Sequence, residues 1–174
     1  MNHNAVQIVS GSVTISDLPA FLQSLNDFSS KYNIKIQGFD TRKIIDTDHL
    51  LFSIYRARFA FENHVNQAKD ISLETLRFSS GQRKIDKSFS MGLIQGENRS
   101  IFVLFGDSKE LLENAENAFK LEFSLKESAD LTIEEKKPFL MKQFGITDEE
   151  LSAAGDNRLK DLIMERVALV DVTR

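Results

Sequence analysis

The sequence predicts an α+β fold, a two-layer α/β sandwich in which a mixed sheet packs against helices. Short apolar runs alternate with longer stretches whose apolar residues recur every three or four positions, so both strands and helices are expected. The chain has 174 residues, close to the length of one domain. Only 2 Pro and 8 Gly occur, and no linker-like stretch divides the chain. We therefore expect a single domain over residues 1–174.

The N-terminal part is predicted to run strand, helix, strand. Residues 5–15 alternate loosely between apolar and polar side chains, which indicates a strand. A helix is expected after a capping residue at Ser16 or Asp17. Its apolar stripe falls at i, i+3, i+4, i+7 and i+10: Leu18, Phe21, Leu22, Leu25 and Phe28. Residues 33–39 are predicted to form the second strand.

The longest predicted helix, at about residues 48–69, is expected at the centre of the fold. Thr47 is the expected N-cap. Apolar residues recur at helical spacing along the whole stretch, and Phe52, Tyr55 and Phe59 add a second apolar flank. Such a helix is expected to be covered on most sides.

The rest of the chain is predicted to alternate strands and helices. Strands are expected at residues 73–79, 100–105, 121–125 and 167–172, and the second of these is apolar enough to be buried on both faces. Helices are expected at about residues 82–92, 107–119, 132–144 and 157–166. Asp107 with Glu110 and Thr132 with Glu135 have the spacing of capping boxes, and a further helical turn is expected at Thr147.

Composition and charge exclude several classes of protein. The chain has no Cys, so it has no disulfide framework, thiol nucleophile or thiolate metal site. No apolar run reaches membrane-spanning length and no signal-peptide pattern is present, so a cytoplasmic location is expected. The net charge is −4, but residues 35–99 carry +3 and the remainder −7. A basic middle fits a local polyanion site, although such an imbalance also arises by chance.

No catalytic or metal-binding pattern emerges from the sequence. Phosphate-binding glycine loops and nucleophile elbows are missing, and His3, His49 and His64 are scattered. Asp46 and Asp48 are interpreted as helix-capping groups, and His64 as a partner for a helix C-terminus. We therefore expect no enzyme activity, no metal and no cofactor.

One segment, residues 77–87, is a candidate anion site. If a strand leads into Ser-Ser-Gly and a helix begins there, free N–H groups and the helix dipole favour a phosphate. Eight residues make up this candidate anion-binding set: Arg77, Ser79, Ser80, Gly81, Gln82, Arg83, Lys84 and Lys87. Two alternatives stay open. Ser80 could be an ordinary N-cap beside a solvated cationic face, or the cradle could belong to a small phosphate- or nucleotide-binding enzyme.

A second candidate site lies near the end of the chain. A helix packed on one side of a sheet leaves part of its apolar stripe exposed, and exposed apolar stripes mark protein interfaces. We therefore expect a partner surface at Leu159, Leu162, Ile163 and Val167.

The motifs around these sites resemble a known family. Ser-Ser-Gly-Gln-Arg-Lys-Ile (residues 79–85), followed by Gly-Leu-Ile at 92–94, is similar to that family's signature helix. The stretches at 64–69, 101–107 and 165–172 also match. The family is the small KEOPS (EKC) subunit that binds the complex's atypical kinase, the PRPK-binding protein (TPRKB-like) family.

The resemblance implies a non-catalytic role. Members contact the kinase/ATPase directly and stimulate it, and they meet the other KEOPS subunits indirectly. They are also implied to capture the single-stranded 3′ CCA end of tRNA, in support of threonylcarbamoyladenosine modification. Single-stranded RNA recognition requires cations and an apolar floor. Phe78 and Phe89 could supply the floor, although burial in the core is the favoured interpretation for each. A scaffold that binds only its protein partner remains the third hypothesis.

Overall fold

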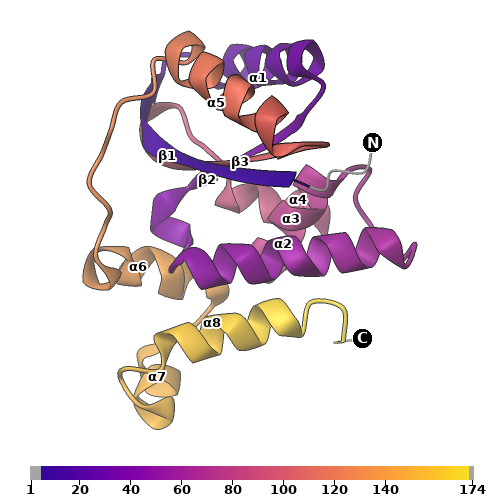
Figure 1. The fold of residues 1–174 in the computed structure, drawn as a ribbon. Helices are drawn as coiled ribbons and strands as arrows, with labels where there is room; N and C mark the ends of the chain where they lie inside the picture. Colours follow the sequence, from indigo (N-terminus) through magenta and orange to yellow (C-terminus); the bar gives the residue numbers. More distant parts are fainter. Residues whose placement is uncertain (1–4, 173–174) are drawn as a thin grey trace. The chain divides into compact units, whose positions relative to one another are not determined.

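The computed structural model describes residues 5–172 and has an α+β architecture, which confirms the predicted fold class (Figure 1). Its residues group into two compact units. The first comprises residues up to 41 and 93–130, and the second comprises 42–92 and those from 131 onward. Each unit is described by itself, and a single domain over residues 1–174 stays a prediction.

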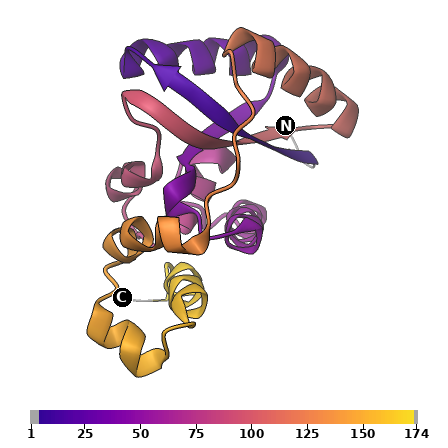
Figure 2. The same cartoon turned by 90° about the vertical axis from the view of Figure 1, so that its left-hand side faces the viewer.

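The first unit is a three-stranded antiparallel sheet covered by two helices. The strands β1 (Ala5–Ile15), β2 (Lys35–Asp40) and β3 (Gly96–Gly106) are arranged in the order β1-β3-β2. Ala5 lies opposite Gly106 and Lys35 lies opposite Phe105. Helices α1 (Leu18–Tyr32) and α5 (Lys109–Glu122) lie together over one face of the sheet (Figure 2). Phe28, Phe102, Phe119 and Phe123 interlock in the core between sheet and helices.

The second unit is helical in the part of the chain that the structure describes. Its helices are α2 (Thr47–Glu62), α3 (Ile71–Ser79), α4 (Ile85–Ser88), α6 (Ile133–Phe144), α7 (Asp148–Ala154) and α8 (Leu159–Ala168). Short 3-10 turns occur at Thr41–Lys43, where the units meet in sequence, and at Phe89–Met91. One core cluster joins α6, α7 and α8: Ile45, Leu140, Phe144, Ile146, Leu151, Leu159, Ile163 and Val167.

Local capping signals predicted several helix starts correctly. The Asp17 carboxylate accepts the backbone N–H of Ala20 at 2.9 Å and begins α1. Thr132 and Glu135 form the expected capping box of α6, and Thr147 caps α7. Helix α2 begins one residue earlier than predicted because Asp46, rather than Thr47, is its N-cap.

The predicted strand at 73–79 is wrong, because these residues belong to helix α3. Asp70 caps this helix by accepting the backbone N–H of Leu73 at 3.0 Å. Almost every side chain of α3 is buried, polar ones included. A helix buried all round has no amphipathic period, so its pattern resembles that of a buried strand.

The sheet and the ends of several elements also differ from prediction. The sheet is antiparallel rather than mixed. Helix α2 ends at Glu62 instead of residue 69, because His64 has a left-handed backbone with φ 56°. The helix expected at 82–92 is only α4 and a 3-10 turn. The strand expected at 121–125 does not form: α5 continues to Glu122 and a turn follows, and Lys126 then makes an isolated bridge with Ser12.

Two further boundaries are corrected by the structure. The strand expected at 167–172 does not form, since α8 continues to Ala168 and turns follow. Helix α5 is capped by Ser108, which accepts the backbone N–H of Leu111, and not by Asp107.

Candidate functional site

The structure buries the first part of the segment at 77–87. Arg77, Ser79 and Ser80 have no exposed surface. Ser80 is the C-cap of α3, and its hydroxyl donates to the Arg77 carbonyl at 2.7 Å and contacts the Ser88 hydroxyl at 2.9 Å. No helix begins at Ser80-Gly81, so the expected cradle of free N–H groups is not formed there. Phe78 is also fully buried, which makes it a core residue and not a floor for bases.

The second part of the segment is exposed and cationic. Gly81 turns the chain with φ +66°, a conformation that suits glycine, and Gln82 is half-buried. Arg83, Lys84 and Lys87 are exposed, with Asp86 as the nearest acidic side chain in sequence. Phe89 follows with 58% of its surface exposed. We call Gln82, Arg83, Lys84, Lys87 and Phe89 the basic segment.

The residues expected to bind a partner lie mostly in the core. Leu159, Ile163 and Val167 are buried against side chains of α6 and α7, and Leu162 is half-buried at the edge of this cluster. The exposed stripe is expected only for a helix that packs on one side. In the structure α6 and α7 pack against this stripe. Its apolar side chains are therefore buried within the protein and do not form an exposed interface.

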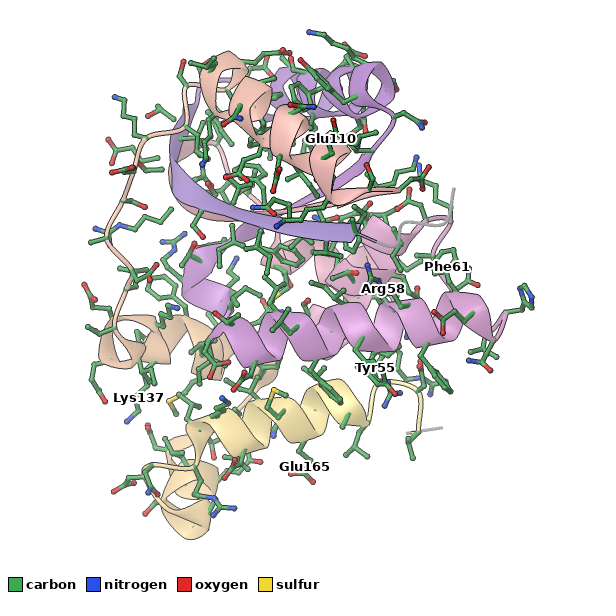
Figure 3. All side chains as sticks on the ribbon, viewed as in Figure 1. Tyr55, Arg58, Phe61, Glu110, Lys137 and Glu165 are labelled. Carbon is green, nitrogen blue, oxygen red and sulfur yellow. The ribbon has the colours of Figure 1, made fainter. Side chains whose placement is uncertain are left out.

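An apolar stripe that the sequence predicts to be covered is instead exposed on α2. Leu51, Tyr55 and Phe59 keep 49%, 62% and 50% of their surface exposed. They lie at i, i+4 and i+8, so they share one face of the helix. Figure 3 shows Tyr55 on the α8 side of α2, whereas Arg58 and Phe61 are labelled on the other side. The opposite apolar face, with Leu50, Ile54, Ala57 and Ala60, is buried.

The turn after α8 brings further apolar side chains beside this stripe. The Arg56 guanidinium on α2 donates from Nη1 to the Ala168 carbonyl at 3.3 Å, which joins α2 to the end of α8. Beyond that point Leu169 is 37% and Val172 is 66% exposed. We call Leu51, Tyr55, Phe59, Leu169 and Val172 the α2/C-terminal surface. Exposed apolar side chains on adjoining elements are candidates for a protein interface.

A buried histidine fixes the start of α2 against the end of α3. His49 Nδ1 accepts the backbone N–H of Ile45 at 3.4 Å, so Nε2 carries the proton and donates to the Ser79 carbonyl at 2.9 Å. Burial lowers the pKa of His49 to about 4. The ring is therefore neutral near pH 7, and both of its nitrogens are used within the protein.

Other candidate polar groups also have structural partners. Asp46 caps α2 by accepting the backbone N–H of His49 at 3.0 Å, as the sequence predicted. Lys160 reaches both Asp46 and Asp48 at 2.6 Å, and these bonds raise the pKa of Lys160. Lys136 is buried and donates to the carbonyls of Ile44 and Ile45.

The described residues offer no metal-binding cluster. Between residues 5 and 172, no three His, Cys, Asp or Glu side chains come together in a way that could hold a metal ion. Over the same residues, no helix is both long and apolar enough to cross a bilayer. His3 lies outside the described residues.

These surfaces define a class of binding protein, in which an α+β scaffold presents an apolar helix face and a cationic segment. The chain belongs to the family described as Kinase binding protein CGI-121, whose sequence profile matches residues 13–171. This match confirms the family resemblance noted in the sequence. A comparison with curated proteins gives no match.

Proposed function

We propose that this protein is a non-catalytic, cytoplasmic subunit of a KEOPS complex. It binds and stimulates the complex's atypical kinase/ATPase, and it recruits tRNA through the 3′ CCA end for threonylcarbamoyladenosine modification. Kinase binding rests on the family, which is described as kinase-binding. The single observation in the structure that supports it most is the exposed apolar stripe on α2.

The α2/C-terminal surface has the chemistry of a protein-docking site. It combines a tyrosine, a phenylalanine and three aliphatic side chains, and aromatic anchors carry much of the binding energy at protein interfaces. All three exposed members on α2 sit on a helix whose other face is in the core. A rigid helix presents such side chains without a large ordering penalty. We therefore place the kinase on this surface.

The test is the affinity of the kinase for matched charge variants. Tyr55→Glu should weaken binding by about 30-fold or more, since one buried aromatic anchor contributes about 2 kcal/mol or more. Leu121→Glu is the control, because Leu121 is 82% exposed but lies on α5 in the first unit. Wild-type affinity in Tyr55→Glu, with both variants folded by circular dichroism, would contradict the proposed docking site.

The basic segment supports the RNA role. Single strands are bound by cations that contact phosphates and by aromatic rings on which bases stack. Arg83, Lys84 and Lys87 supply exposed charge and Phe89 supplies an exposed ring. Arg83 is the main candidate, since a guanidinium pairs with a phosphate through two parallel hydrogen bonds. The buried Ser80 holds the start of this segment, because its hydroxyl oxygen accepts the backbone N–H of Gln82 at 3.1 Å.

A comparison of intact tRNA with tRNA trimmed of its CCA end tests this role. The intact molecule should bind more tightly, and Arg83→Glu should lose more affinity than Lys84→Glu at low salt. Phe89→Ala should weaken binding with little change in salt dependence, because stacking involves no counterion release. Equal affinity for the two tRNAs would leave a scaffold that binds only the kinase.

The enzyme hypothesis is less well supported. A phosphate cradle at Ser80-Gly81 needs a helix that starts there, whereas Ser80 ends α3 and α4 begins at Ile85. Turnover of ATP by the isolated chain, abolished by a substitution in this chain, would reverse this preference.

A further inference from the structure

Two arginines from two helices hold one carboxylate near the end of the chain. Arg77 of α3 donates from Nη1 to Asp171 Oδ1 at 2.9 Å. Arg56 of α2 places Nη2 at 3.6 Å from Asp171 Oδ2. Each carboxylate oxygen therefore has its own guanidinium, and the turn after α8 is tied to both helices.

Arg77, the more deeply buried of the two arginines, is held in place by its neighbours. Arg77 is completely buried, and its Nη2 donates to Glu74 Oε1 at 2.6 Å. Glu74 is itself fixed, because its carboxylate accepts the backbone N–H of Ala68 at 2.8 Å. The Arg77 guanidinium also lies 4.4 Å from the centre of the Phe78 ring. With Nη2 held by Glu74, Arg77 presents its Nη1 in a fixed position.

The charges in this cluster balance only when Asp171 is present. Glu74 and Asp171 carry two negative charges, and Arg56 and Arg77 carry two positive ones. The Arg77 side chain is buried and that of Asp171 is 31% exposed, and a buried charge is strongly unfavourable when it loses its partner. The ion pair therefore favours the arrangement of the chain in which Asp171 meets Arg77. The cluster is therefore suited to hold the turn after α8 in one position.

The segment that Asp171 fixes contains part of the docking surface. Leu169 and Val172 flank Asp171 in sequence and are both exposed. The turn has a second anchor, since Val170 is 1% exposed and the Leu169 backbone N–H donates to the Glu165 carbonyl at 2.9 Å. Loss of Asp171 should loosen this turn without unfolding α8.

We propose that Asp171 is a positioning residue for the kinase contact. Held by Arg56 and Arg77, it fixes the C-terminal turn so that Leu169 and Val172 join Leu51, Tyr55 and Phe59 in one preformed surface. This inference rests on the proposed function, because it assigns the kinase as the partner of that surface. Its premise is that a preformed surface binds more tightly than one that must first be ordered.

The experiment compares Asp171→Ala and Asp171→Asn, which change the turn after α8, with a variant at the start of α8. Both Asp171 variants should bind the kinase about tenfold more weakly, corresponding to the loss of about one interfacial contact. Amide hydrogen exchange at residues 169–172 of the isolated variants should become faster, while exchange within α2 stays as in wild type. Asp171→Glu, which keeps the carboxylate, should recover part of the affinity.

Lys160→Ala is the matched control. Lys160 also forms ion pairs that link α8 to α2, but through Asp46 and Asp48 at the opposite end of α8. This variant should leave both kinase affinity and exchange at residues 169–172 unchanged. An equal loss of affinity in Lys160→Ala would mean that α8 needs only general anchoring, and it would overturn the specific role of Asp171.

The outcomes separate this inference from the proposed function. If Tyr55→Glu loses binding while Asp171→Ala binds as wild type, the docking surface stands and the positioning role is refuted. If Tyr55→Glu also binds as wild type, both are refuted. Unchanged exchange at residues 169–172 in Asp171→Ala refutes the positioning role whatever the affinity.

Discussion

Acidification should destabilise this protein through His49, the buried ring that joins the start of α2 to the end of α3. Burial lowers the pKa of His49 to about 4 from an ordinary value of 6.5. The folded state therefore binds a proton less readily than the unfolded chain does. The stability that the neutral ring contributes is fully present above about pH 6.5 and is lost as the pH falls from there towards 4.

The size of the effect follows from the two pKa values. One pKa unit corresponds to about 1.4 kcal/mol of difference between the protonation states. With 6.5 in the unfolded chain and about 4 in the fold, linkage gives a loss of about 2 kcal/mol between pH 7 and pH 5. Because His49 is fully buried, solvent does not screen the ring, and the full loss of about 2 kcal/mol is expected.

Urea unfolding at pH 7 and pH 5 measures this loss. His49→Gln removes the titrating ring, so the wild-type free energy of unfolding should fall by about 2 kcal/mol more than that of the variant. His64→Gln controls for the removal of an exposed histidine. The reasoning is refuted if wild type and His49→Gln lose the same free energy of unfolding between the two pH values.

Three further predictions concern α6, the helical core and the basic segment. Thr132→Ala removes the capping box of α6 and should lower the free energy of unfolding by about 1 kcal/mol. Ser128→Ala, in the exposed loop before α6, is the control. An equal loss in both variants would contradict the capping role of Thr132. Leu140→Ala opens a cavity in the core of the second unit and should cost about 2–5 kcal/mol by urea unfolding, whereas a change under about 1 kcal/mol would contradict its burial. Arg83→Glu should reduce the slope of log affinity for tRNA against log salt by about 0.7 for each lost phosphate contact, and an unchanged slope would remove Arg83 from the interface.

Short-range signals in the sequence predict several helix starts and one buried strand correctly. The N-cap at Asp17 and the capping box at Thr132 depend on residues three positions apart, and both form as predicted. The apolar run at 100–105 lies in the C-terminal half of β3, where residues 102–105 are buried. Such features are decided by local geometry, so one sequence reveals them.

Burial could not be predicted where it depends on distant partners. The sequence makes Arg77 a candidate RNA contact, because its partner Asp171 lies 94 positions away in the chain and no local pattern joins the two. Leu159, Ile163 and Val167 were expected at an interface because nothing in the pattern shows that α6 and α7 cover them. The same limit applies to Tyr55 and Phe59, since apolar character alone does not separate a core face from a docking face.

Hydrogen exchange of the chain with and without its kinase tests the central claim most directly. Kinase binding should slow amide exchange in α2 around residues 51–59 and in the turn at 169–172, because a bound partner suppresses local opening. Exchange in the basic segment at 82–89 should stay as in the free chain, leaving that segment available for RNA. Protection confined to α1 and α5 of the first unit, with none on α2, would contradict the account.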